Sequence, residues 1–173
     1  MDFEPGWAIL AGLVGGAAMA VILYMGILMM PRQMKMNVFM LLGSMTLPVG
    51  TAAFVMGAMI HAGMSAVFGL VHGAVFSAAD IGSAYAAWGL LFGLVHWAVA
   101  GMALGMMPMM HPRIRYEGRR LVAAAVGNPH PERLLDPPGF FALNYPPMTA
   151  MGFLMLHLLF GVLVGALYGA WAG

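Results

Sequence analysis

The sequence has no cysteine and very little charge. Without cysteine, disulfides, thiolate metal sites and cysteine nucleophiles are excluded. Charged residues make up 8% of the chain, with 7 basic and 6 acidic side chains, whereas a soluble domain carries roughly 25%. So few charges cannot cover a surface that faces water. The sequence therefore predicts that this chain lies in a lipid bilayer, which is its expected partner.

Acidic residues are also missing from every long apolar stretch. This excludes a carboxylate proton relay or a carboxylate-bridged metal centre inside the membrane. The dense histidine motifs of membrane di-iron oxygenases are absent too, and no spacing of polar residues matches a catalytic mechanism. The few basic residues are better explained by membrane phosphates than by nucleic acid. The sequence thus favours a non-enzymatic protein with no nucleic-acid partner.

Apolar residues, by contrast, make up 62% of the chain. A membrane-spanning helix needs about 20 consecutive apolar residues. Four stretches of this kind are present, at residues 6–30, 48–76, 83–107 and 148–171. Prolines lie at their edges, and Pro108 is expected to end the third helix. The predicted fold is all-α: a single transmembrane domain over residues 1–173 that forms a four-helix bundle.

The connections between these helices predict an orientation. All seven basic residues lie in the first connection (31–47) or the third (108–147), and none lies in the short second turn (77–82). Positive charge favours the cytoplasmic side. We therefore expect both termini to face outward, an interfacial first connection, and a cytoplasmic loop over 108–147, in a multi-pass protein of a cell inner membrane. Four arginines of that loop are expected to contact lipid phosphates: Arg113, Arg115, Arg119 and Arg120.

Small residues recur at four-residue steps within the predicted helices. Membrane helices approach closely through such stripes, because lipid provides no hydrophobic drive for them to associate. Stripes include Gly12 with Gly16, Gly89 with Gly93, and Gly161 with Gly165. A closely packed bundle is the expected result.

Four of the six histidines lie inside the predicted spans: His61, His72, His96 and His157. Counting along the helices places His61, His96 and His157 within roughly 6 Å of one another in depth, near the middle of the bilayer. An ionisable residue inside the membrane is a functional candidate by default. His72 lies three turns from His61 and shares its helix face nearer the outer surface.

These histidines allow two interpretations. Imidazoles at one depth could ligate haem b or a copper ion, and the neighbouring glycines would leave room for a porphyrin. Alternatively, each imidazole donates one hydrogen bond to a neighbouring helix. The sequence leaves both interpretations open.

Methionine is unusually frequent, with 20 residues. Thioethers select Cu(I), and one cluster would suit it: Met106, Met107, Met109, Met110 and His111. Methionine also fills irregular gaps and makes adaptable surfaces for a partner. Simple filling of the helices is the favoured interpretation, and a partner surface is an intermediate one.

The last helix reads His157-Leu-Leu-Phe-Gly161-Val-Leu-Val-Gly165-Ala-Leu-Tyr168-Gly169. It resembles the final helix of small four-helix bacterial inner-membrane proteins of unknown function, in which a histidine is also followed by spaced glycines and a tyrosine. The resemblance covers about a tenth of the chain. It implies a bacterial inner membrane and a four-helix bundle, but no activity.

The predicted function is an accessory or structural subunit that packs against other membrane subunits or forms a homo-oligomer. The alternative is a redox or metal protein that holds haem b or copper at the intramembrane histidines. A third hypothesis, a pore or transporter, would need oligomerisation to enclose a path.

Overall fold

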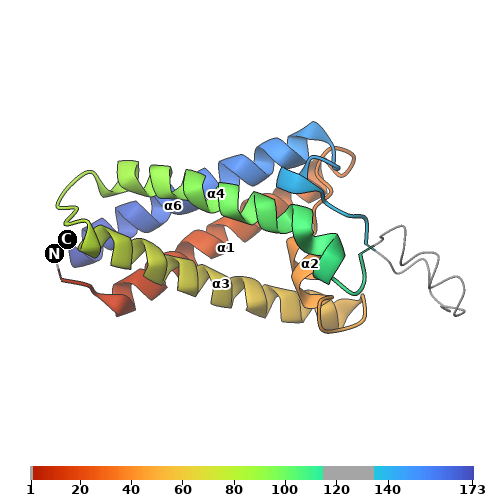
Figure 1. Ribbon diagram of the computed structural model, residues 1–173, viewed down its shortest axis with the longest axis horizontal. Helices are drawn as coiled ribbons and strands as arrows, with labels where there is room; N and C mark the ends of the chain where they lie inside the picture. The colour runs from red at the N-terminus through yellow and green to blue at the C-terminus, as the bar shows by residue number, and fades with distance from the viewer. Residues whose placement is uncertain (1, 115–134) are drawn as a thin grey trace, which may run out of the picture.

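A computed structural model describes residues 2–114 and 135–173 of the chain (Figure 1). The long helices are α1 (Pro5–Met29), α3 (Thr51–Ala78), α4 (Tyr85–Met110) and α6 (Pro147–Ala172). Two shorter elements are helix α2 (Val38–Gly43) and the 3-10 turn η2 (Phe140–Ala142). All four long helices are long and apolar enough to cross a membrane, as predicted.

The helix ends lie within three residues of their predicted positions, with one informative difference. Helix α4 does not end at Pro108 but continues to Met110. A proline removes one N–H donor and crowds the preceding turn, which costs least near a helix end. The backbone N–H of His111 donates to the carbonyl of Met107 at 2.7 Å and closes this last turn.

The helices pack through backbone contacts at glycine. A Cβ atom added to Gly161 of α6 would collide with the carbonyl oxygen of Gly89 in α4, and one added to Gly89 would collide with that of Gly161. The same relation joins α1 to α3, where a Cβ on Gly12 would strike the carbonyl of Ser65. Glycine is therefore required at these helix crossings.

Neighbours in sequence are not the main neighbours in space. Helix α4 packs along α6, and α1 packs against α3 and α6, whereas α3 and α4 share few contacts. In Figure 1, α1 is seen between α3 and α4, and α2 lies at the end away from the turn that joins them. Because α3 and α4 share so few contacts, space remains inside the bundle beside α2.

Helix α2 lies within the predicted interfacial segment, residues 31–47, and packs closely on α3. A Cβ on Gly43 would collide with the carbonyl of Ala53, and Leu41 and Leu42 are buried. The Asn37 side chain caps the helix: its Oδ1 accepts from the backbone N–H of Met40 at 2.9 Å. Helix α2 is thus held as part of the bundle end.

Replacing Asn37 with alanine should loosen α2. The same Oδ1 also accepts from the Tyr24 hydroxyl at 2.8 Å, so the substitution removes two hydrogen bonds at once. Loss of an N-cap typically costs about 1 kcal/mol. Hydrogen exchange should become faster in residues 38–43 of Asn37→Ala and stay unchanged in Gln33→Ala, an exposed polar residue of the same connection. Equal protection in both variants would contradict this role.

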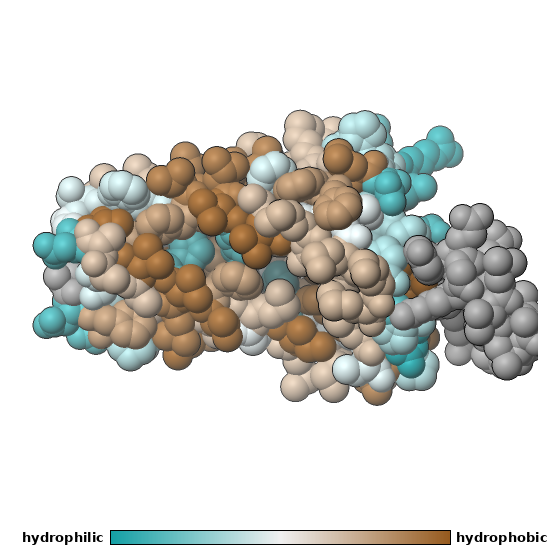
Figure 2. Space-filling view, viewed as in Figure 1, coloured by the Kyte–Doolittle hydropathy of each residue, from teal (hydrophilic) through white to brown (hydrophobic). Residues whose placement is uncertain are grey.

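The outer surface fits a lipid environment. Figure 2 shows apolar residues along the middle of the molecule and hydrophilic ones toward its two ends. Large apolar side chains are exposed along the long helices, among them Leu28 at 81% and Val95 at 57%. The chain is therefore a multi-pass membrane protein by the length and composition of its four long helices. Which membrane it occupies and which way it faces stay predictions.

Candidate functional site

A cavity of about 230 Å³ lies within the bundle, beside helices α3 and α4, which share few contacts. Side chains from α1, α2, α3, α4 and α6 line it, and most of the lining is apolar. Its polar members include three of the four intramembrane histidines: His61, His96 and His157. The helices thus bring together in one apolar chamber residues that are almost a hundred positions apart in sequence.

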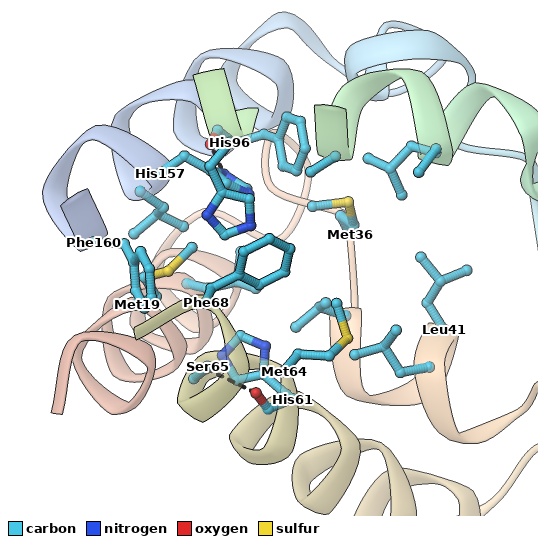
Figure 3. A pocket seen from close by; sticks show the side chains of 18 of the residues that line it. Met19, Met36, Leu41, His61, Met64, Ser65, Phe68, His96, His157 and Phe160 are labelled. Atoms are coloured by element: carbon cyan, nitrogen blue, oxygen red, sulfur yellow. Dashed lines mark hydrogen bonds between the residues drawn. The ribbon is translucent and has the colours of Figure 1, made fainter. Parts of the chain in front are cut away.

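The histidines form an adjacent pair with two outlying members. The rings of His96 and His157 meet edge to face with centroids 4.9 Å apart, and His72 lies 6.3 Å from His96. His61 occupies another wall, and in Figure 3 the Phe68 ring stands between it and the pair. Phe68 stacks on His96 at 3.7 Å. The three histidines predicted to share one depth therefore line one cavity without meeting at a single point.

Two of the cavity histidines have their tautomers fixed by backbone carbonyls. The Nδ1–H of His157 donates to the carbonyl of Phe153 at 2.7 Å. The Nε2–H of His61 donates to the carbonyl of Gly16 at 3.1 Å. A carbonyl oxygen only accepts, so the proton of each neutral ring lies on the bonded nitrogen. The second nitrogen, Nε2 of His157 and Nδ1 of His61, then carries a lone pair.

Two further imidazole nitrogens are buried without a hydrogen-bond partner among the described residues. They are Nε2 of His72, whose Nδ1–H donates to the carbonyl of Phe68 at 2.7 Å, and Nδ1 of His96. A buried polar atom without a partner typically costs about 1–3 kcal/mol. Of the hydrogen bonds expected between helices, the described residues show one, from His61 to Gly16 of α1. His72 and His157 instead donate to the carbonyl four residues earlier on their own helix.

This arrangement does not form a three-ligand metal site. Within residues 2–114 and 135–173, no group of three or more histidine or acidic side chains is placed to hold a metal ion. The His96–His157 pair offers two imidazoles, and four methionines line the same cavity: Met19, Met36, Met64 and Met107. Imidazole and thioether together are donors that suit copper.

The geometry does not favour haem. The glycines expected to leave room for a porphyrin are filled by neighbouring helices. A Cβ on Gly93 would come within about 2.5 Å of the carbonyl oxygen of His157, and one on Gly16 would collide with the Ser65 hydroxyl. With His96 and His157 in edge-to-face contact, there is also no gap for a macrocycle between their rings.

The second predicted soft-metal cluster does not assemble. Met106, Met109 and Met110 are 47%, 76% and 59% exposed on the outside of α4, whereas Met107 faces the cavity. His111 is fully buried. The side chains of this cluster point in different directions because α4 remains helical through Pro108. A helix distributes consecutive side chains around its axis.

His111 has a structural role. Its Nε2–H donates to the carbonyl of Leu41 at 2.8 Å, and its Nδ1 accepts from the backbone N–H of Arg113 at 3.1 Å. The Arg113 guanidinium donates to the carbonyl of Ser44 at 2.7 Å. Both residues tie the end of α4 to the end of α2. Contacts with lipid phosphates stay a prediction, and Arg115, Arg119 and Arg120 lie outside the described residues.

A second, more polar recess of about 740 Å³ lies at the end of the bundle, between residues 27–41 and 135–146. It shares Met36 and Leu41 with the histidine-lined cavity. At its edge, the Tyr145 hydroxyl donates to the carbonyl of Asp136 at 2.9 Å. Burial, aided by the negative charge of Asp136, raises the pKa of Tyr145 to about 12. This phenol therefore stays neutral and acts as a donor.

The aromatic walls of the cavity are not among the predicted site residues. Phe160 is 1% exposed, and its ring lies 5.5 Å from His96 and 5.6 Å from His72. Helical spacing contained the signal: Phe160 follows His157 by three residues, and Phe68 precedes His72 by four, so each shares a face with a histidine.

Comparisons with protein-family models, with curated proteins and with solved structures find no match for this chain.

Proposed function

We propose that this protein binds a small, largely apolar molecule inside the membrane, in the cavity between α3 and α4. The observation that carries the proposal is an apolar chamber of about 230 Å³ whose wall includes the lone pairs of His157 Nε2 and His61 Nδ1 and the buried Nδ1 of His96, which has no partner among the described residues. Ligand sites are typically apolar with a few polar groups that fix orientation. The cavity has this composition.

The volume limits the size of the ligand. A protein cavity of about 150 Å³ lined by apolar side chains holds benzene, and sites for drug-sized molecules start near 300 Å³. A chamber of 230 Å³ therefore suits one or two fused rings or a short branched chain. Lipid acyl chains are apolar enough to enter, but they offer no donor to the imidazoles.

Naphthalene is a suitable probe, because it has two fused rings and no polar atom. We expect it to bind the protein in lipid nanodiscs above the background of empty discs. Ala100→Phe, which fills the cavity, should abolish this binding. Ala17→Phe, on the exposed side of α1, should leave it unchanged. Equal binding by wild type and Ala100→Phe would contradict the proposal.

Copper(I) is a second candidate, favoured by the four methionines and two adjacent imidazoles of the same cavity. Protein purified without chelators should then retain copper in proportion to the chain, and His157→Phe should lose it. Metal analysis that finds no copper after exposure to Cu(I) would exclude this candidate.

The accessory-subunit role stays a prediction. It needs a surface that a protein partner covers, and lipid already accounts for the exposed apolar side chains of the long helices. The orientation also stays a proposal: both termini face outward, and the membrane is a cell inner membrane. Purification in mild detergent gives a direct test: a stable larger assembly supports the role, and a free monomer contradicts it.

A further inference from the structure

We infer that the ligand is a membrane-dissolved aromatic alcohol, of the phenol class, that enters sideways between α3 and α4 and donates its hydroxyl to His157. This inference rests on the proposed ligand-binding function and adds the chemical class and the route. It is carried by three features of the cavity: the polarity of its wall, its aromatic lining and its opening.

Two of the three histidines that line the cavity, His157 and His61, present acceptors. The Nδ1–H of His157 donates to the Phe153 carbonyl, so the Nε2 of this ring carries a lone pair. The Nε2–H of His61 donates to the Gly16 carbonyl, so the lone pair of that ring lies on Nδ1. The Ser65 hydroxyl already donates to the carbonyl of His61 at 2.7 Å. A ligand that satisfies either of these two acceptors must therefore supply a donor, and a hydroxyl group does so without burying a net charge.

His157 is the best placed of these acceptors. It is 7% exposed, and its ring is fixed by the Phe153 carbonyl and by the edge-to-face contact with His96. A preorganised acceptor in an apolar chamber strengthens a hydrogen bond relative to one made in water. The ligand hydroxyl should thus select this imidazole.

The remaining walls suit an aromatic body. The rings of Phe68 and Phe160 border the chamber, as do the thioethers of Met19, Met36 and Met64 (Figure 3). Aromatic rings attract one another in offset or edge-to-face geometry, and methionine sulfur makes favourable contacts with ring edges. An aromatic ligand gains from both kinds of contact, whereas a saturated chain gains only from burial.

The opening of the chamber faces the bilayer. Met64 of α3 and Val99 of α4 both line the cavity, yet they are 42% and 52% exposed on the outer surface. Figure 2, viewed onto α3 and α4, shows hydrophilic surface recessed within this otherwise apolar face. Toward the end of the bundle, by contrast, Met36 and Leu41 line both cavities and are only 5% and 4% exposed. A lipid-soluble molecule therefore enters from the side.

The ligand class is tested with two probes of nearly equal shape, 1-naphthol and naphthalene. We expect 1-naphthol to bind the wild-type protein in nanodiscs about fivefold more tightly, after correction for partitioning into empty discs. His157→Phe keeps a ring of similar size without the lone pair and should remove this preference while naphthalene still binds. Equal affinities in the wild type, or a preference that survives in His157→Phe, would overturn the inference. Failure of both probes to bind would instead refute the proposed function.

The route is tested by narrowing the opening. Val99→Trp and Met64→Trp should each slow the association and the release of 1-naphthol by about tenfold, with the equilibrium affinity changed much less. Val95→Trp, one turn away on the lipid-facing side of α4, should change neither rate. Rates unchanged in both opening variants, with binding intact, would show that the ligand enters elsewhere.

Discussion

Gly161→Leu is expected to prevent stable assembly of the bundle. A Cβ at this position would collide with the carbonyl oxygen of Gly89 and lie 2.8 Å from the Cα of Gly93, so α4 and α6 would have to separate. Overpacking inside a well-packed core costs about 1–3 kcal/mol, and a clash with backbone has no side chain that can move away. We expect a loss of about 3 kcal/mol or more, measured by unfolding in mixed micelles with SDS.

The matched control is Gly63→Leu. Gly63 lies in the middle of α3, and a Cβ there would meet nothing within 4 Å. Replacing a helix-interior glycine in open space should stabilise the helix slightly. If both substitutions changed the unfolding midpoint equally, the glycine contact between α4 and α6 would not hold the bundle together.

Phe160→Ala should destabilise the fold and enlarge the cavity at the same time. The Phe160 side chain is 1% exposed and contacts His72 and His96. Removing a buried phenylalanine ring typically costs about 3–5 kcal/mol. We expect a loss of this size in the same unfolding assay, and binding of anthracene, a three-ring probe, that the wild-type cavity excludes.

Leu94→Ala provides the comparison for Phe160→Ala. Leu94 is 43% exposed on α4 and does not line the cavity, so its truncation should cost less than about 1 kcal/mol and admit no larger probe. A comparable loss of stability in the two variants would mean that Phe160 is not part of a packed core.

The four long helices were predictable because length and hydropathy are local properties. The stretch predicted at residues 6–30 is found at Pro5–Met29, and the stretch predicted at 148–171 is found at Pro147–Ala172. Local reasoning was weakest at Pro108, where the helix continues for two residues because its last turn has few hydrogen bonds left to lose.

The pairing of the helices was not predictable in the same way. Glycine stripes are visible in the sequence, but they do not say which stripe meets which. The tight turn between α3 and α4 would suggest that these two helices pack together, yet α4 packs on α6. The contacts at Gly89 and Gly161 bring α4 and α6 together, whereas α3 and α4 share few contacts.

The contacts among the histidines were not predictable for the same reason: they depend on how the helices pack. Counting residues gives the depth of His61, His96 and His157 but not the direction of each side chain around its helix axis. The positions of the helices decide that His96 meets His157, and the ring of Phe68 separates His61 from them. The pair and the cavity beside it are therefore properties of the tertiary structure.

The most direct test of the account is the nitrogen NMR spectrum of ¹⁵N-histidine-labelled protein in nanodiscs, recorded as 1-naphthol is added. The Nε2 of His157 should shift as it accepts a hydrogen bond, while its Nδ1, already bonded to the Phe153 carbonyl, changes little. The shift should saturate in the wild type and be absent in Ala100→Phe. Histidine nitrogens that do not respond in the wild type, or that respond equally in the filled variant, would contradict a ligand site in this cavity.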